Sequence, residues 1–512
     1  MSISAVRDLS QNALLRLLDA LVDPLRRERT ALFMLAGYAA VWTLYGAVAK
    51  SSQDIHFDMG EMIAWSREVT FGTPKHPPFG AWLVRVWFFI FPLADWSYYL
   101  FAILLATFAL WVAWRMSAPY LDGEKRVVGL ALLTLVPFFN FHALKFNANT
   151  VMVPLWAVTT WLFLRSFETR GTCFAAFAGL AAAAAMLGKY WSIFLLLGLA
   201  IAALLDKRRA VYFRSPAPYV TIAFGALALA PHIVWLNANH FAAFEYALAS
   251  HPATLWSAIG SCFAYVVGAL AYLVVPTLIV VAVAHPSRAA MFDTLWPHDP
   301  PRRLVLLAFV LPLLLPAIAA LVTREEIVSL WAMGSMTLFP IVLLSSPRLV
   351  ISRMAATIVL IVAIAVPVLV AAAAPAIAVI IHRNGVSNFA AHYRLVAEAV
   401  EKTWRETINQ PLRVIGSYDN LLNGVVFYLP DQPSTFEVIS PDRTPWVDEA
   451  RIARDGIALV CPIVVPECTH AVNERAAKHP AVKRVEVEIS RSYFGLADKP
   501  ERYLIVLIPP HG

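Results

Sequence analysis

Long apolar runs, separated by short polar segments, make up most of the chain. A helix that crosses a bilayer needs about 20 mainly apolar residues. The runs are continuous rather than alternating, which favours membrane helices over barrel strands. We expect about 11–13 spans, several of them short. The candidates lie at residues 31–49, 79–94, 97–115, 127–143, 150–165, 173–188, 190–205, 217–236, 262–284, 302–322, 328–346 and 351–381.

The pattern changes after residue 382, where charged residues become much denser and approach the density of soluble domains. Apolar residues recur at helical spacing over 390–408, which predicts an amphipathic helix. Short strand-like runs follow at 412–418, 424–429, 456–461, 482–489 and 502–508. We therefore expect two parts: a membrane body, residues 1–382, and a soluble domain of mixed α/β type, residues 383–512.

Composition supports this division. The 512 residues are 59% hydrophobic and 15% charged, against about 45–50% and about 25% in soluble domains. These values exclude a soluble enzyme, a disordered chain and a nucleic-acid-binding domain as the main interpretation. The formal net charge of +7 marks cytoplasmic loops rather than a nucleic-acid partner.

Lys and Arg near the span ends predict the orientation, since they are enriched in cytoplasmic loops. Arg26, Arg27 and Arg29 precede the first span, which places the N-terminus inside and residues 50–78 outside. Residues 207–209 indicate another inner loop. Residues 1–30 are polar and amphipathic, so we expect no removable signal peptide.

The loop at 50–80 concentrates polar chemistry beside the apolar runs. It contains Asp54, His56, Asp58, Glu61, Lys75 and His76. Charges placed against a bilayer are costly and are usually functional, although a solvated outer loop remains the alternative. A carboxylate here can serve as a general base, and a nearby cation can stabilise a departing phosphate. Asp54, His56 and Asp58 would share one face of an extended strand, and such a set is a weak candidate metal site.

Several motifs follow one another along the chain. In the loop they comprise Asp58, Trp65, Gly72, His76, Pro77, Pro78 and Trp82. Three further segments are LGKYWSIFLLL at 187–197, PHIVWLNANHFAAFEYAL at 231–248 and GVVFYLPDQPSTF at 424–436. The order of these motifs resembles the family-39-type GT-C glycosyltransferases, the group of the protein O-mannosyltransferases and of bacterial aminoarabinose and galacturonic acid transferases.

Three elements depart from the family pattern. The family's acidic pair is Asp58–Met59 here, and the residues at its later acidic element are Asn147, Ala148 and Asn149. Because these carboxylates are missing, we expect no bound metal. The family's lysine before Pro-Pro is His76, with Lys75 just upstream. The chain contains no Gly-rich phosphate loop, and the resemblance implies no nucleotide or other cofactor.

The resemblance implies a GT-C-like membrane enzyme that transfers a monosaccharide from a polyprenyl-phosphate donor, with inversion, to a hydroxyl of a cell-envelope acceptor such as lipid A or the lipopolysaccharide core. Its partners would be the lipid-linked sugar, a lipid or glycolipid acceptor and membrane lipids. Asp58 would be the catalytic base. The other residues expected to bind substrate are Asp54, His56, Glu61, Lys75, His76, Asn149, Lys189, Tyr190, His240 and Arg324.

Several of these residues also have structural interpretations. Lys189 opens an apolar run, where a lysine often extends to the membrane interface. Arg324 lies in a polar turn between spans, His240 is compatible with a structural histidine, and Asn147 and Asn149 are suited to capping a helix.

Two other classes of function stay open. One is a transporter or flippase of lipid-linked sugar, although internal repeats and charged residues at mid-span, which are typical of transporters, are not evident. The other is a non-catalytic lipid-binding protein of the envelope.

The resemblance places residues 383–512 and the loop at 50–80 on the periplasmic face of the bacterial inner membrane. Disulfides form in that compartment, and we predict one between Cys461 and Cys468, because Pro462 and Pro466 favour a turn between them. Two buried free thiols are the alternative. Cys173 and Cys262 lie in apolar runs and are expected to be buried.

Overall fold

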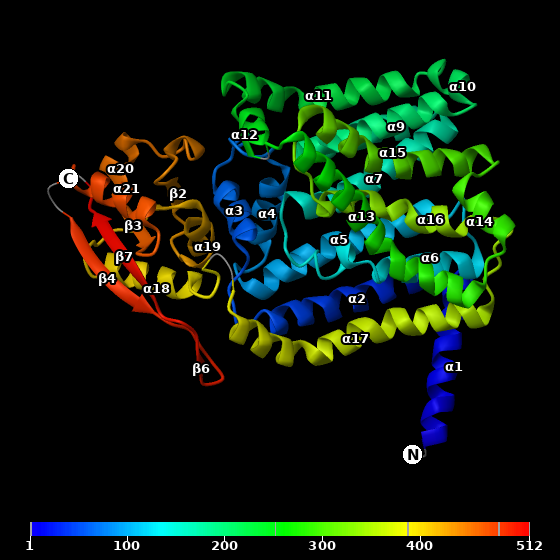
Figure 1. Cartoon of the computed structure of the whole chain (residues 1–512), viewed down its shortest axis with the longest axis horizontal. Coiled ribbons are helices and arrows are strands. Elements are labelled where there is room, and N and C mark those ends of the chain that lie inside the picture. The colour runs from blue at the N-terminus through cyan, green and yellow to red at the C-terminus, as the bar shows by residue number, and fades with distance from the viewer. Residues whose placement is uncertain (1–2, 251, 387–388, 480–481, 511–512) are drawn as a thin grey trace. The chain divides into compact units, whose positions relative to one another are not determined.

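The computed structural model describes residues 3–250, 252–386, 389–479 and 482–510. Most of the chain is helical, and a small mixed sheet lies in the C-terminal part (Figure 1). Contacts divide the chain into two compact units: Met1–Thr43 with Leu100–Ala371, and Leu44–Tyr99 with Ala372–Gly512. The polar loop at 50–80 therefore folds in the same unit as the C-terminal domain.

Seven helices in the described part of the chain are long and apolar enough to cross a membrane. They are α2 (Arg27–Ala49), α5 (Asp95–Ser117), α7 (Ala148–Thr169), α11 (Ala217–Ala238), α13 (Leu255–Ala284), α15 (Pro300–Thr323) and α17 (Arg353–Asn384). Shorter apolar segments are α4 (Phe79–Ile90), α8 (Thr172–Gly188), η2 with α9 (Tyr190–Leu205) and η3 with α16 (Ser329–Leu344). The predicted class, a polytopic helical membrane protein with a C-terminal α/β domain, is confirmed.

The predicted span at 127–143 is wrong. Helix α6 (Gly123–Thr134) ends early, and a 3-10 turn, η1 (Pro137–Phe139), follows it. Pro137 has no N–H with which to continue the helical ladder. The side chain of Asn140 donates hydrogen bonds to the carbonyls of Thr134 and Val136, at 3.0 and 3.2 Å, and so satisfies the end of the helix.

Helices of the first unit pack closely through small residues. An added Cβ at Gly179 of α8 would lie 2.3 Å from the carbonyl oxygen of Thr221 on α11, so only glycine fits this crossing.

Cys262 is buried as predicted, whereas the prediction for Cys173 is wrong: it is exposed, in the first turn of α8. The remaining helices of this unit are α1 (Ile3–Val22), α10 (Arg209–Phe213), α12 (Ala242–Ser250) and α14 (Arg288–Leu295).

The C-terminal domain contains a five-stranded sheet, within the described residues, in the order β2-β1-β3-β7-β4. Strands β1, β2 and β3 are parallel, while β7 runs antiparallel to both β3 and β4. The strands are β1 (Val414–Ser417), β2 (Ser434–Glu437), β3 (Ile457–Pro462), β4 (Lys483–Ile489) and β7 (Glu501–Ile508); β5 (Ser492–Tyr493) pairs with β6 (Leu496–Ala497).

Four helices pack with this sheet: α18 (Tyr393–Arg405), α19 (Asp419–Tyr428), α20 (Glu449–Asp455) and α21 (Pro466–Ala476), with a 3-10 turn η4 (Pro441–Arg443). The predicted helix at 390–408 is confirmed by α18. The predicted strand at 424–429 is wrong, because residues 424–428 belong to α19 and are buried almost throughout. A short apolar run buried on all sides does not distinguish a strand from a helix by periodicity.

Cys461 at the end of β3 and Cys468 on α21 form the predicted disulfide, with their Cα atoms 5.8 Å apart. Both residues are fully buried in the apolar core that α20, α21 and the sheet share. The bond therefore ties α21 to the central strand of the domain.

Candidate active site

Asp58 lies in the first turn of the short helix α3 (Phe57–Arg67). His56 caps this helix, because its Nδ1 accepts a hydrogen bond from the backbone N–H of Asp58 at 3.2 Å. The idea that Asp54, His56 and Asp58 share one face of an extended strand is wrong, since the helix begins between them. The side chain of Asp58 is 21% exposed, so a reacting group can approach it. Because Asp58 lies at the N-terminus of a helix, the helix dipole stabilises its negative charge.

Helix α3 is held in place by the C-terminal domain. Its residues from Met59 to Ser66 are all buried, and it packs against α19; Figure 1 shows the two helices beside each other. An added Cβ at Gly60 would lie 1.8 Å from the carbonyl oxygen of Asn423. This backbone-to-backbone approach fixes where Asp58 and Glu61 lie relative to α19.

Glu61 and Lys75 form a buried ion pair, with the Lys75 Nζ atom 2.5 Å from Glu61 Oε1. Burial raises the pKa of Glu61 to about 7; Lys75 opposes the rise, while the negative charges of Asp419 and Asp58 add to it. Burial thus favours the protonated form of Glu61, while the charge of Lys75 favours the ionised form.

A tight turn holds Lys75 and His76 near α3. The Thr73 hydroxyl accepts hydrogen bonds from the backbone N–H groups of Lys75 and His76, at 3.3 and 2.9 Å. The His76 ring meets the ring of Trp65 edge-on, with centroids 5.7 Å apart. The structure thus brings together Asp58, Glu61 and the turn that carries Lys75.

Asp419, which the sequence analysis missed, joins this acidic cluster from the C-terminal domain. It begins α19, directly after β1, and its Oδ1 accepts a hydrogen bond from Asn423 Nδ2 at 2.5 Å. Residues that follow parallel strands commonly line ligand sites. Asp419 could have been identified as a candidate site residue from its position after β1, if β1 had been recognised as a parallel strand.

Asp54 lies apart from this cluster, in a buried ion-pair network. Its Oδ1 atom is 2.6 Å from an Arg491 guanidinium nitrogen, and its Oδ2 accepts the backbone N–H of Arg394 at 2.9 Å. Burial raises the pKa of Asp54, and the charge of Arg491 opposes this rise. A carboxylate that is 1% exposed and paired in this way ties the loop to the C-terminal domain.

A second group of predicted residues lies in the other compact unit and is described by itself. Lys189 Nζ is 2.5 Å from Asn149 Oδ1 and 4.6 Å from the centre of the Trp331 ring. Asn147 caps α7 with its side chain, as the structural interpretation expected.

Tyr190 extends this second group. Its hydroxyl is 3.0 Å from Nε2 of the buried His232, and its ring stacks on Phe244. His240 and Arg324 are exposed at the ends of α11 and α15, with φ angles of 52° and 58°. His232, which the sequence analysis did not single out, is thus the histidine bonded to Tyr190.

A cavity of about 680 Å³ lies along α3 and α4. Phe89 on its wall is 90% exposed, and two arginines, Arg67 and Arg85, donate to backbone carbonyls there. The lining residues are Ile63, Ser66, Arg67, Arg85, Val86, Phe88, Phe89, Leu93 and Gln432. Within the described residues, no group of three or more His, Cys, Asp or Glu side chains is arranged to hold a metal ion.

Comparisons with known proteins agree with this architecture. Residues 75–235 match the family model described as dolichyl-phosphate-mannose-protein mannosyltransferase. No curated protein matches the sequence significantly.

Among solved structures, the chain is similar to ArnT from Cupriavidus metallidurans bound to undecaprenyl phosphate, with 12% identity and a TM-score of 0.60 over 93% of this chain and 97% of that one. The apo state of the same enzyme has a TM-score of 0.59, with the same identity and coverage. The chain therefore shares the fold of ArnT, and its residues 75–235 match the protein mannosyltransferase family model.

Proposed function

We propose that this chain is an inverting glycosyltransferase that moves a monosaccharide from a polyprenyl-phosphate donor to a hydroxyl of a cell-envelope acceptor such as lipid A or the lipopolysaccharide core. The observation that carries this proposal is the position of Asp58, a partly exposed carboxylate next to the buried Glu61–Lys75 pair. The similar ArnT structure contains undecaprenyl phosphate, which supports a polyprenyl-linked donor.

In the proposed reaction, Asp58 takes the proton from the acceptor hydroxyl, and the hydroxyl oxygen attacks the anomeric carbon of the donor sugar. The bond from that carbon to the phosphate oxygen breaks, and the polyprenyl phosphate leaves with the electron pair. Cationic groups stabilise charge that develops on a leaving phosphate. We assign this role to Lys75 and Lys189, with His76 and Arg324 as further candidates.

The remaining substrate contacts are assigned by residue type and surroundings. His56, Glu61, Asn149, Tyr190 and His240 offer groups that bind sugar hydroxyls. Asp54 positions the loop through Arg491. The apolar wall along α3 and α4 suits the lipid part of an acceptor, because exposed aromatic side chains favour contact with lipid.

The proposal also covers topology. Residues 1–382 form the membrane body that carries the outer loop at 50–80, and residues 383–512 form a domain on the periplasmic face of the bacterial inner membrane. The disulfide supports this side, because disulfides are rare in the cytosol.

The test compares Asp58→Asn with Asp122→Asn in membranes supplied with a polyprenyl-phosphate sugar. Asp122 is an exposed residue whose side chain makes no cap hydrogen bond, so it is a matched control. We expect Asp58→Asn to lose at least 100-fold in transfer while still binding donor, and the control to keep full activity. Full transfer by Asp58→Asn would contradict the assigned base.

The sugar and the acceptor are identified by mass spectrometry of envelope lipids from a strain that lacks the gene. A missing hexose, pentose or uronic acid mass on one lipid would name both. Unchanged lipids, together with a lipid-linked sugar that accumulates on one side of the membrane, would instead favour a transporter.

A further inference from the structure

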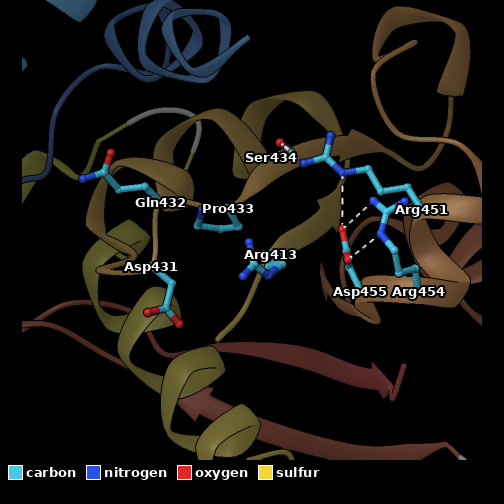
Figure 2. A pocket seen from close by; sticks show the side chains of 8 residues that line it. All are labelled: Arg413, Asp431, Gln432, Pro433, Ser434, Arg451, Arg454 and Asp455. Carbon is cyan, nitrogen blue, oxygen red and sulfur yellow. Dashed lines mark hydrogen bonds and ion pairs between the residues drawn. The ribbon is translucent and has the colours of Figure 1, made fainter. Parts of the chain in front are cut away.

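A second polar cavity, of about 630 Å³, lies in the C-terminal domain (Figure 2). Arg413 immediately precedes β1, Ser434 begins β2, and Asp455 lies two residues before β3. The cavity is therefore at the amino ends of the three parallel strands, whereas Asp419 follows the carboxyl end of β1. Its lining residues are Arg413, Asp431, Gln432, Pro433, Ser434, Arg451, Arg454 and Asp455.

Two arginines on one wall of this cavity are held in fixed positions. Arg451 donates to the carbonyl of Trp446 at 2.8 Å and to the Ser434 hydroxyl at 2.7 Å. Arg454 pairs with Asp455 at 3.0 Å, and its side chain is 68% exposed. A guanidinium has five N–H donors, so both arginines keep donors beyond these contacts.

Arg413 differs from these two arginines. Figure 2 shows its side chain in the middle of the view, with Asp431 on one side and the Arg451–Asp455–Arg454 group on the other. Within the described residues, its guanidinium makes no hydrogen bond or ion pair. A hydrogen bond from Arg454, with the charges of Arg451 and Arg413, holds the pKa of Asp455 below its usual value. The negative charge of Asp455 is thus already balanced by its ion pairs with Arg451 and Arg454. Arg413 supplies the remaining positive charge.

The chemistry of this lining indicates a class of ligand. Arginine forks bind phosphate oxygens with defined geometry, and a phosphate group can accept from more than one guanidinium. The Asp431 carboxylate and the Gln432 amide are suited to sugar hydroxyls. Pro433 is the one apolar residue among those that line the cavity, so a polar headgroup fits it better than a lipid chain.

We propose that this cavity binds a phosphorylated saccharide, with its phosphate at Arg413 and the neighbouring arginines, and its hydroxyls at Asp431 and Gln432. The volume lies within the range of about 300–1,000 Å³ that is usual for small-ligand sites. Gln432 also lines the cavity along α3 and α4, but none of the three arginines belongs to that cavity or to the cluster around Asp58, so the site is tested independently of the proposed transfer reaction.

The test measures binding of glucose 1-phosphate to the purified full chain in detergent, by titration calorimetry. We expect saturable binding that weakens at least tenfold in Arg413→Gln and in Arg454→Gln. Both side chains are exposed, so these variants should fold. The control is Arg484→Gln, an exposed arginine on β4 at the far edge of the same sheet, which removes one charge but should leave binding unchanged.

Two additional ligands test separately whether the phosphate and the saccharide contribute to binding. Glucose should not bind, and inorganic phosphate should bind more weakly than glucose 1-phosphate. Equal binding of inorganic phosphate and the sugar phosphate would overturn the saccharide assignment, and equal loss in Arg484→Gln would overturn the site.

The same sugar phosphate carrying a decyl chain distinguishes two sources of this headgroup. Tighter binding of the decyl form supports a lipid headgroup, and equal binding supports a soluble sugar phosphate. Either result supports the site.

Discussion

Asp58 and Glu61 lie three residues apart on α3, yet their surroundings differ. Asp58 is partly open at the start of the helix, whereas Glu61 is buried against Lys75. An accessible carboxylate can contact an incoming hydroxyl, whereas a buried carboxylate mainly interacts electrostatically with neighbouring side chains. This contrast is why we assign the base to Asp58 and a supporting role to Glu61.

The raised pKa of Glu61 predicts a pH-dependent stability. The folded chain, with a Glu61 pKa of about 7, binds this proton more tightly than the unfolded chain, for which the reference value is 4.5. The free energy of unfolding should therefore fall by about 3 kcal/mol as the pH rises from below 4.5 to above 7. Melting temperatures at pH 5 and 8 should converge in Glu61→Gln, but not in the exposed control Glu398→Gln. Equal slopes in both variants would contradict the assignment.

Lys189 is predicted to contact the donor phosphate. Its ammonium group lies over the ring of Trp331 and beside the side chain of Asn149, and a lysine is a compact cation suited to a phosphate. Lys189→Met should weaken donor binding about tenfold or more, with little effect on the choice of acceptor. Lys207→Met, at an exposed polar loop, is the control. Unchanged donor affinity in Lys189→Met would leave the lysine with a structural role.

At the scale of elements, the contact between α3 and α19 positions the candidate site. Gly60→Ala would place a methyl group against the backbone carbonyl of Asn423, which cannot move aside cheaply. We expect the variant to be destabilised by about 1–3 kcal/mol and to lose transfer activity. Gly37→Ala, in α2, meets no atom within 4 Å and should be neutral. Both effects are measured by melting in detergent and by a transfer assay; a fully stable, active Gly60→Ala would refute this packing role.

The disulfide should stabilise the C-terminal domain. Closing the short loop between Cys461 and Cys468 restricts the unfolded chain, and this effect is worth about 2–3 kcal/mol. Reduction should make residues 457–476 more accessible to hydrogen exchange, while a Cys173→Ser, Cys262→Ser variant should behave like the wild type. No change in exchange on reduction would contradict the prediction.

The elements that the sequence predicted well are those with a strong pattern. The apolar runs identified the long helices, and the strand-like run VKRVEVEI at 482–489 identified β4 (Lys483–Ile489). The failures lie where partners distant in sequence decide the structure. Residues 424–428 form a helix because α3 and α18 pack against α19, and Asp54 is a buried structural residue because it pairs with Arg491. Neither partner is evident from local spacing.

For the whole molecule, the orientation in the membrane is a testable prediction. Single-cysteine reporters at Lys499→Cys and Lys207→Cys, in a Cys173→Ser, Cys262→Ser background, should report opposite sides of the membrane. The Lys499 side chain is 88% exposed, and Lys207 lies beside two arginines in a proposed inner loop. An impermeant maleimide should label the first reporter in intact spheroplasts, and the second after permeabilisation. The reverse pattern would place the C-terminal domain in the cytoplasm.

The pairing of Leu44–Tyr99 with Ala372–Gly512 has a consequence for biosynthesis. A ribosome adds about 5–20 residues per second, so the intervening residues 100–371 take on the order of tens of seconds to make. During that interval α3 and its neighbour α4 have been made but α19 does not yet exist, so the face of α3 that packs on α19 lacks that partner on the nascent chain. We therefore expect α3 to reach its final packing only after the C-terminal domain has been made. A chain that stops before residue 372 lacks α19, and we expect its α3 segment to be more susceptible to proteolysis than that of the full chain.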